Sequence, residues 1–128
     1  MPEETPFDKY IQQLEFAPDS PEWRSMPLAQ RVLASFAAIM SDQVNDWLVN
    51  VVGAPSEELT LYCEALEAIG ASWLATDIRA LAVSDLESDD SQTKLMKLNE
   101  QVEANWGALW TAAEDYARQH GWSEAASK

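Results

Sequence analysis

The chain has 128 residues, of which 22 are Asp or Glu and 8 are Lys or Arg, so its formal net charge is −14 at pH 7. A surface this negative repels nucleic acid and anionic membranes, which excludes direct binding to either and favours basic protein partners. Because 47% of the residues are hydrophobic, the chain is not a disordered acidic tail, and its length suits a single domain over residues 1–128.

Residues 1–26 are expected to form an N-terminal helical extension. Thr5 followed by Pro6 is a typical helix start, and apolar residues follow it at three- and four-residue steps. A second start signal at Ser20 predicts one short turn that anchors Trp23.

The middle of the chain is predicted to be a long helical segment followed by a tight helical hairpin. Helical apolar spacing runs from Pro27 to Val51, which fits either one kinked helix or two helices in sequence, the second starting at an N-cap formed by Ser41 and Asp42. The hairpin begins near Ser56, and its first helix ends at Gly70, where a residue that accepts a left-handed conformation is needed. Its second helix is expected to bury Trp73 on its apolar face.

The last helical region is predicted over residues 91–120, with Gly107 as either a kink or a point of close backbone approach, and residues 122–128 as a frayed tail. The loop before it, residues 82–92, carries several acidic residues but lacks the glycine and the closing glutamate of a calcium-binding loop. A solvated loop without a metal site is therefore expected. Together the elements predict an all-α fold, a single-domain acidic bundle of about six or seven helices.

The sequence predicts no active site. A Cys–His pair would require Cys63 to meet His120, but Cys63 lies on the apolar face of its helix and is expected to be buried. Neither a Glu-x-x-His pattern for a di-metal site nor a Gly-rich phosphate loop is present. We therefore predict a protein that is not an enzyme and has no catalytic residues, cofactor or metal.

The location of the protein is predicted from its cysteine content and its N-terminus. A single cysteine suits a reducing compartment, and the acidic N-terminus does not have the pattern of a signal peptide. No apolar run reaches the roughly 18 residues of a membrane span. A cytoplasmic protein without membrane contact is expected.

The acidic side chains themselves can be interpreted as a binding surface. Carboxylates on adjacent helix turns lie about 5–6 Å apart, which is on the scale of the phosphate spacing along one DNA strand. The alternative interpretation is that they are the solvent faces of amphipathic helices, or that they keep the protein soluble. The candidate carboxylates are Asp42, Asp46, Glu57, Glu58, Glu64, Glu67, Asp77, Asp85, Glu87, Asp89 and Asp90. The candidate aromatic anchors are Trp47 and Trp73.

The central residues resemble a known family. The run Glu-Ala-Leu-Glu-Ala-Ile-Gly-Ala over 64–71, followed by Trp73 and Ala75, resembles the central signature of a bacterial family known for a DNA-mimic protein. The family also carries an upstream motif, Asn-Gly-Gly-Phe-x-Gln-aromatic-aromatic-x-Asn-x-x-Gly, whose later positions are matched by Trp47, Asn50 and Gly53, with the apolar Leu48 at the second aromatic position. The chain departs from the motif's first four residues, where it has Ser41, Asp42, Gln43 and Val44. The resemblance extends over about residues 28–120, and its last matching positions are Tyr116 and His120.

The resemblance implies an all-helical fold, a homodimer and an acidic surface that occupies the DNA-binding face of a transcription factor. The leading hypothesis is a DNA mimic that binds and inhibits a basic nucleic-acid-binding protein, which could be a transcription factor, a nuclease or a phage-defence complex, as in anti-restriction or anti-CRISPR proteins. One alternative is an immunity or antitoxin protein that neutralises a toxin. Another is a small-ligand protein or enzyme with a site near Asp42, Trp47 and Asn50.

Overall fold

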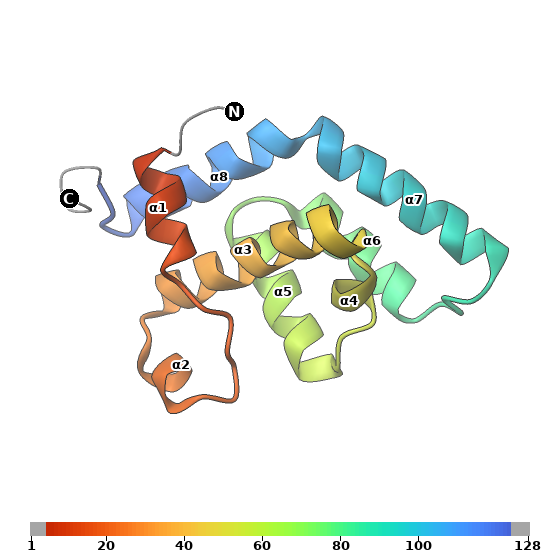
Figure 1. Ribbon diagram of the computed structural model, residues 1–128, viewed down its shortest axis with the longest axis horizontal. Helices are drawn as coiled ribbons and strands as arrows, with labels where there is room; N and C mark the ends of the chain where they lie inside the picture. The colour runs from red at the N-terminus through yellow and green to blue at the C-terminus, as the bar shows by residue number, and fades with distance from the viewer. Residues whose placement is uncertain (1–4, 124–128) are drawn as a thin grey trace.

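The computed structural model describes residues 5–123, and every regular element within them is a helix (Figure 1). The predicted fold class, one all-α domain, is confirmed. Within the described residues the helices are α1 (Pro6–Gln12), α2 (Pro21–Ser25), α3 (Leu28–Asp46), α4 (Val49–Val52), α5 (Ser56–Ala68), α6 (Ser72–Ala82), α7 (Asp89–Ala104) and α8 (Trp106–Gln119). None of the described helices combines the length and the apolarity that crossing a membrane requires.

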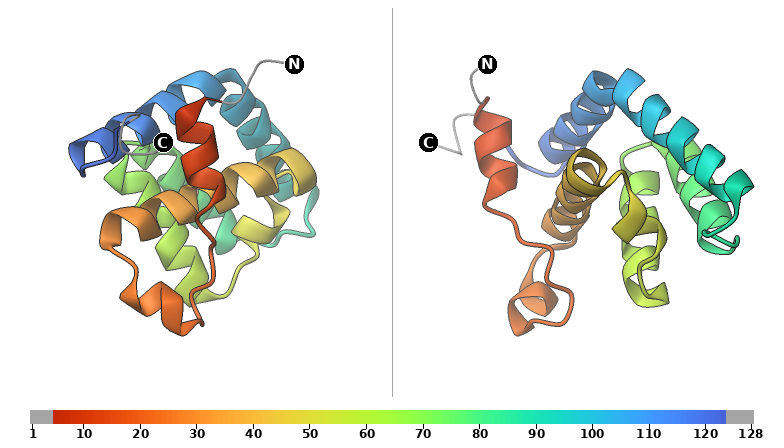
Figure 2. Two further views of the ribbon diagram at one scale, coloured as in Figure 1. Left: turned by 60° about the vertical axis from the view of Figure 1, so that its left-hand side comes forward. Right: turned by 45° about the vertical axis from the view of Figure 1, so that its right-hand side comes forward.

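Helix α3 is the central element of the fold. It packs against α5, α4, α1 and α8, while α5 and α6 form the predicted hairpin beside it. Figures 1 and 2 show α7 and α8 as two arms that meet at a bend, with α8 beside α3 and α7 beside α6. The core between these helices is apolar, and its fully buried side chains include Phe36, Ile39, Met40, Leu66 and Leu74.

Helix α1 belongs to this core and is not appended to it. Thr5 and Asp8 form a reciprocal capping box at the start of α1, with both hydrogen bonds at 3.1 Å. Phe7 is buried, and its ring meets that of Trp122 edge to face at a centroid distance of 5.3 Å. Trp122 is therefore a packed core residue, although the sequence placed it in the frayed tail. The rest of that predicted tail, residues 124–128, lies outside the described residues.

The middle of the chain follows the prediction with two exceptions. Of the two arrangements left open, the structure has two helices, but the predicted start of the second at Ser41 and Asp42 is wrong, since α3 continues to Asp46 and α4 follows after a two-residue corner. Gly70 ends the first hairpin helix with a φ of +89°, as its position predicted. The second exception is Trp73, which is 39% exposed. The buried stripe of α6 is made by Leu74, Ala75, Ile78 and Leu81, so Trp73 lies one position outside it at the edge.

The last helical region breaks at Asn105 and not at Gly107. The Asn105 side-chain amide donates to the carbonyl of Gln101 at 2.8 Å, and its backbone N–H donates to the same carbonyl at 3.0 Å. Asparagine side chains compete in this way with the helical hydrogen-bond ladder. Gly107 lies inside the first turn of α8, where its φ is not positive.

Candidate functional site

The chain leaves α3 through two consecutive left-handed residues. Trp47 has a φ of 55° and Leu48 a φ of 66°, and within the described residues they are the non-glycine residues with positive φ. This conformation costs about 1–2 kcal/mol per non-glycine residue, and such strain concentrates at functional sites. The corner turns the Leu48 side chain completely into the core and leaves Trp47 65% exposed. A large apolar side chain is thereby displayed on the surface by a strained backbone.

Side chains from three helices hold this corner in place. The Asp42 carboxylate accepts hydrogen bonds from Asn50 Nδ2 at 2.8 Å and from the backbone N–H of Val51 at 3.0 Å. Asp42 thus caps the first turn of α4, a role normally filled by the residue just before a helix. From α7, the buried Asn99 donates through Nδ2 to the carbonyl oxygen of Trp47 at 2.7 Å. The left-handed backbone persists because these contacts fix both sides of it.

The exposed tryptophan has apolar and acidic neighbours. A cavity of about 330 Å³ is lined by Gln43, Val44, Trp47, Glu103 and Trp106. Val44 is 61% exposed, and the buried Gln43 amide donates to the Glu103 carboxylate at 3.4 Å. On the same corner Asp46 accepts a hydrogen bond from Asn50 at 3.2 Å. We call Asp42, Val44, Asp46, Trp47 and Glu103 the Trp47 corner.

A further predicted carboxylate, Glu58, acts on the same side chain as Asp42. Burial raises the pKa of the Tyr62 phenol to about 12, and the negative charges of Glu58 and Asp42 add to the shift. The two carboxylates therefore act on the same phenol, although they come from α5 and α3. Glu57 precedes Glu58 in the first turn of α5 and is exposed.

The remaining predicted carboxylates lie elsewhere, and two of them are ion-paired. Glu67 pairs with Arg79, near which Glu64 also lies, and Asp90 pairs with Lys94 at 3.0 Å. Asp77, Asp85, Glu87 and Asp89 are exposed on α6, on its connection to α7 and at the start of α7. Because Asp89 and Glu103 are fourteen residues apart on α7, they are separated by about 21 Å along the helix axis. The predicted carboxylates thus form separate groups.

The negative charge of the Trp47 corner has no counter-ion on the described surface. Ion pairs within residues 5–123 are Arg79–Glu67, Lys94–Asp90 and Arg118–Glu114. None of them includes a carboxylate of the corner. Glu103 was not among the predicted site residues, because it comes from a helix sixty residues further along the chain than Gln43 and no local pattern links the two.

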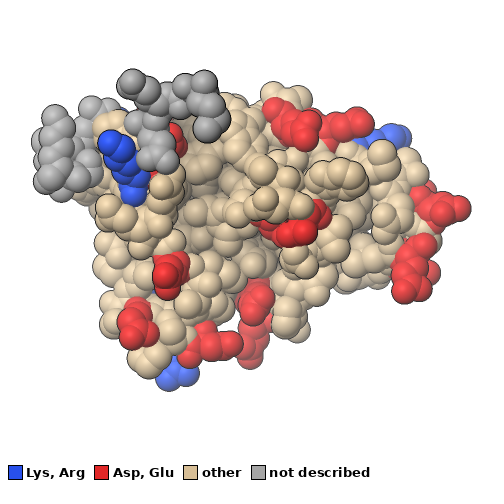
Figure 3. Space-filling view, in the orientation of Figure 1, with Lys and Arg blue, Asp and Glu red and all other residues tan. Residues whose placement is uncertain are grey.

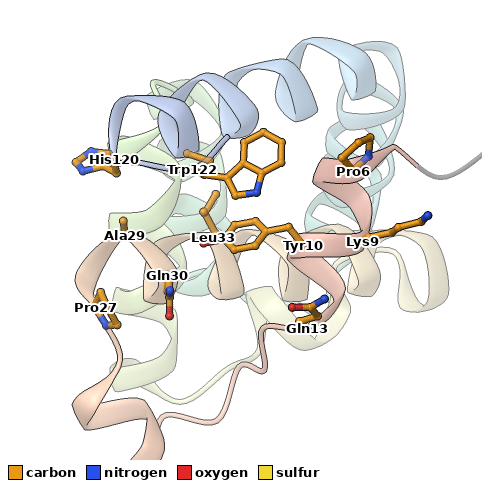
Figure 4. Close-up of a pocket in the computed structure, with 12 residues that line it drawn as sticks. Pro6, Lys9, Tyr10, Gln13, Pro27, Ala29, Gln30, Leu33, His120 and Trp122 are labelled. Atoms are coloured by element: carbon orange, nitrogen blue, oxygen red, sulfur yellow. The ribbon is translucent and has the colours of Figure 1, made fainter. Parts of the chain in front are cut away.

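A separate cavity of about 660 Å³ lies near the start of α3 (Figure 4). Figure 4 shows Tyr10 and Trp122 reaching toward each other in its middle, with Lys9 and His120 at opposite sides. Its described lining contains no carboxylate, and burial raises the pKa of the Tyr10 phenol. This is not the small-ligand site hypothesised at Asp42, Trp47 and Asn50.

Two further groups of side chains bear on possible chemistry. Cys63 is completely buried, as predicted, and burial raises the pKa of its thiol. A buried thiol of raised pKa is a poor nucleophile. Among the residues that the structure describes, no three His, Cys, Asp or Glu side chains are grouped to hold a metal ion.

No protein-family model, curated protein or solved structure matches this chain. The resemblance to the DNA-mimic family therefore stays a prediction, and the function is argued from the geometry of the Trp47 corner.

Proposed function

We propose that this protein binds and inhibits a basic nucleic-acid-binding protein through the Trp47 corner. The observation that carries the proposal is a tryptophan, 65% exposed on a strained left-handed backbone, among carboxylates that lack a counter-ion. Tryptophan is enriched among the residues that dominate the affinity of protein interfaces. Carboxylates without a counter-ion attract the Lys and Arg side chains that would otherwise contact phosphates.

Some residues of the Trp47 corner supply apolar contact area, and others supply negative charge. Trp47 and Val44 supply apolar area that a partner buries on binding. Asp46 and Glu103 are exposed and supply the charges that meet cations of the partner. Asp42 is a positioning residue, because its oxygens already accept hydrogen bonds from Asn50 and Val51. A partner that covers this surface with its phosphate-binding side chains cannot use them on DNA.

Affinity capture from a cell lysate at low salt tests the proposal and can name the partner. The immobilised protein is washed with a salt gradient and, separately, with duplex DNA. We expect capture of a basic DNA- or RNA-binding protein that both treatments release, since exposed charge pairs are screened by salt. A captured partner that duplex DNA does not displace would contradict mimicry and favour the immunity hypothesis.

Variants then locate the surface on the identified partner. Trp47→Ala and Glu103→Lys are each expected to weaken binding by at least about tenfold, which corresponds to about 1.4 kcal/mol. Asp89→Lys makes the same change of charge at the far end of α7 and serves as the matched control. If Asp89→Lys weakens binding as much as Glu103→Lys, only the total charge matters and the corner is not the site.

A further inference from the structure

An apolar groove runs along α3 and ends at the Trp47 corner. A cavity of about 490 Å³ lies on this face; a second, of about 380 Å³, lies between α1 and α8 and adjoins it, and a third, of about 330 Å³, lies at the Trp47 corner. The first two share Trp106 and Trp110, and the first and third share Val44 and Trp106. The three cavities are therefore parts of one continuous groove.

The floor of the groove is made of small side chains and one wall is aromatic. Ala34, Ala37, Ala38 and Ser41 follow one another at helical spacing on α3 and line the floor. Small residues at such spacing let the backbone of a second helix approach closely. The wall is formed by Trp106 and Trp110, whose rings lie 6.1 Å apart.

The wall is fixed from behind by core aromatic residues. Trp110 meets Phe36 edge to face at 5.1 Å and Phe7 at 6.1 Å. Phe36 and Phe7 are both buried, so the position of the indole is set by the core. The groove is thus a preformed feature of the fold.

The dimensions of the groove suit a short helix. From Ala34 to Val44 the floor follows ten residues of α3, which is about 15 Å at 1.5 Å per residue, or three turns. A peptide that binds by adding a strand would instead need the open edge of a sheet, and every regular element of the described residues is a helix. Apolar side chains at helical positions i, i+4 and i+7 would meet such a groove.

The charges around the groove define the chemistry of its occupant. Its described lining includes Asp8 and Glu103 but neither Lys nor Arg. The nearby Lys9 lines the separate cavity near the start of α3. Figure 3 shows this face as a tan depression between α1 and the C-terminal half of α3, with acidic side chains at its margins. A second copy of this chain would bring a formal charge of −14 to the same margins, so charge disfavours it.

We infer that this groove receives a basic amphipathic helix of the partner protein, about three turns long. The inference rests on the proposed function, which supplies a basic partner, and it adds the element of that partner that binds. The apolar face of the helix lies on the alanine floor against the tryptophan wall. Its Lys or Arg side chains reach Asp8 beside the tryptophan wall and the carboxylates of the Trp47 corner at the end of the floor.

A peptide titration tests the groove without knowledge of the partner. The probe is a synthetic helical peptide of about three turns with Leu on one face and Lys and Arg on its flanks. A second peptide has the same composition in scrambled order. Binding to the full chain is followed by NMR, and we expect the amides of residues 34–44 and the indole signals of Trp106 and Trp110 to shift with the amphipathic peptide only.

Two matched variants make the test decisive. Ala38→Leu fills the floor of the groove, whereas Ala80→Leu adds the same side chain to an exposed position on α6. We expect the first to weaken peptide binding by at least about tenfold and the second to leave it unchanged. Circular dichroism confirms that both variants are folded.

Several results would overturn the inference. The groove is not the site if the scrambled peptide binds equally well, or if Ala38→Leu binds the peptide as the unaltered chain does. Sedimentation that shows a dimer dissociated by Ala38→Leu would assign the groove to a second copy. If the peptide binds the groove but no nucleic-acid-binding protein is captured from lysate, the proposed function fails and the groove stands. If such a protein is captured and Ala38→Leu does not weaken it, the groove fails and the proposed function stands.

Discussion

The left-handed corner predicts that glycine at position 47 is more stable than alanine, the reverse of their usual order inside a helix. Trp47→Ala and Trp47→Gly both remove the indole, so they lose the same ring contacts. Alanine retains the cost of about 1–2 kcal/mol for a left-handed residue with a side chain, whereas glycine does not. The glycine variant loses about 0.4–1 kcal/mol of this advantage, because its unfolded chain has more conformational entropy than that of the alanine variant. We therefore expect the glycine variant to be the more stable of the two by about 0.5–1 kcal/mol.

Urea unfolding followed by circular dichroism measures this difference. With an m-value of about 2 kcal/mol per molar, the midpoint of the glycine variant should lie about 0.25–0.5 M above that of the alanine variant. Ala80→Gly, at an exposed position inside α6, is the control and should lower stability by about 1 kcal/mol. An alanine variant as stable as the glycine variant would refute the left-handed corner. Both Trp47 variants should bind the partner equally weakly, because both lack the indole.

Three further predictions concern the polar contacts of the fold. Asp42→Ala leaves the Val51 N–H without its acceptor and should lower the free energy of unfolding by about 1.5–3 kcal/mol. Asp46→Ala should change the free energy of unfolding by less than about 0.5 kcal/mol, and the urea midpoints of the two variants compare these effects. Since the pKa of Tyr62 is raised from 10.0 to about 12, the contribution of its neutral phenol to stability is complete below pH 10 and is lost as the pH rises toward 12. Between pH 10 and 12 the free energy of unfolding should therefore fall less with pH in Tyr62→Phe than in the unaltered chain. Arg79→Ala should leave the thermal unfolding midpoint nearly unchanged at both low and high salt, because its ion pair with Glu67 is exposed and surface ion pairs contribute little to stability.

Much of the helical fold was predictable because its start and stop signals are local. The capping residues Thr5 and Ser20 begin their helices as expected, and Gly70 ends its helix with a positive φ. The break at Asn105 was missed because Gly107, a residue with more conformational freedom, stands two positions away. At Asn105 the side chain competes for a backbone carbonyl, which apolar periodicity does not reveal.

The site was only partly predictable, for a different physical reason. Trp47 was named as an anchor and Asp42 and Asp46 as acids, but nothing in the local sequence requires a left-handed Trp47, since tryptophan does not favour that conformation. The corner is held by tertiary contacts, notably the hydrogen bond from Asn99 across fifty-two residues of sequence. Glu103 reaches the same surface through the packing of α7. Charge composition predicts the sign of a surface but not which carboxylates meet on it.

The central claim is that the Trp47 corner takes the place of nucleic acid on its partner. The most direct test mixes the captured partner with labelled duplex DNA and increasing amounts of this protein, and separates the complexes by sedimentation. We predict that the DNA is released progressively as the protein is added, and that Glu103→Lys must be added at a concentration at least about tenfold higher for the same release. A ternary complex that contains the partner, the DNA and this protein together would contradict the account.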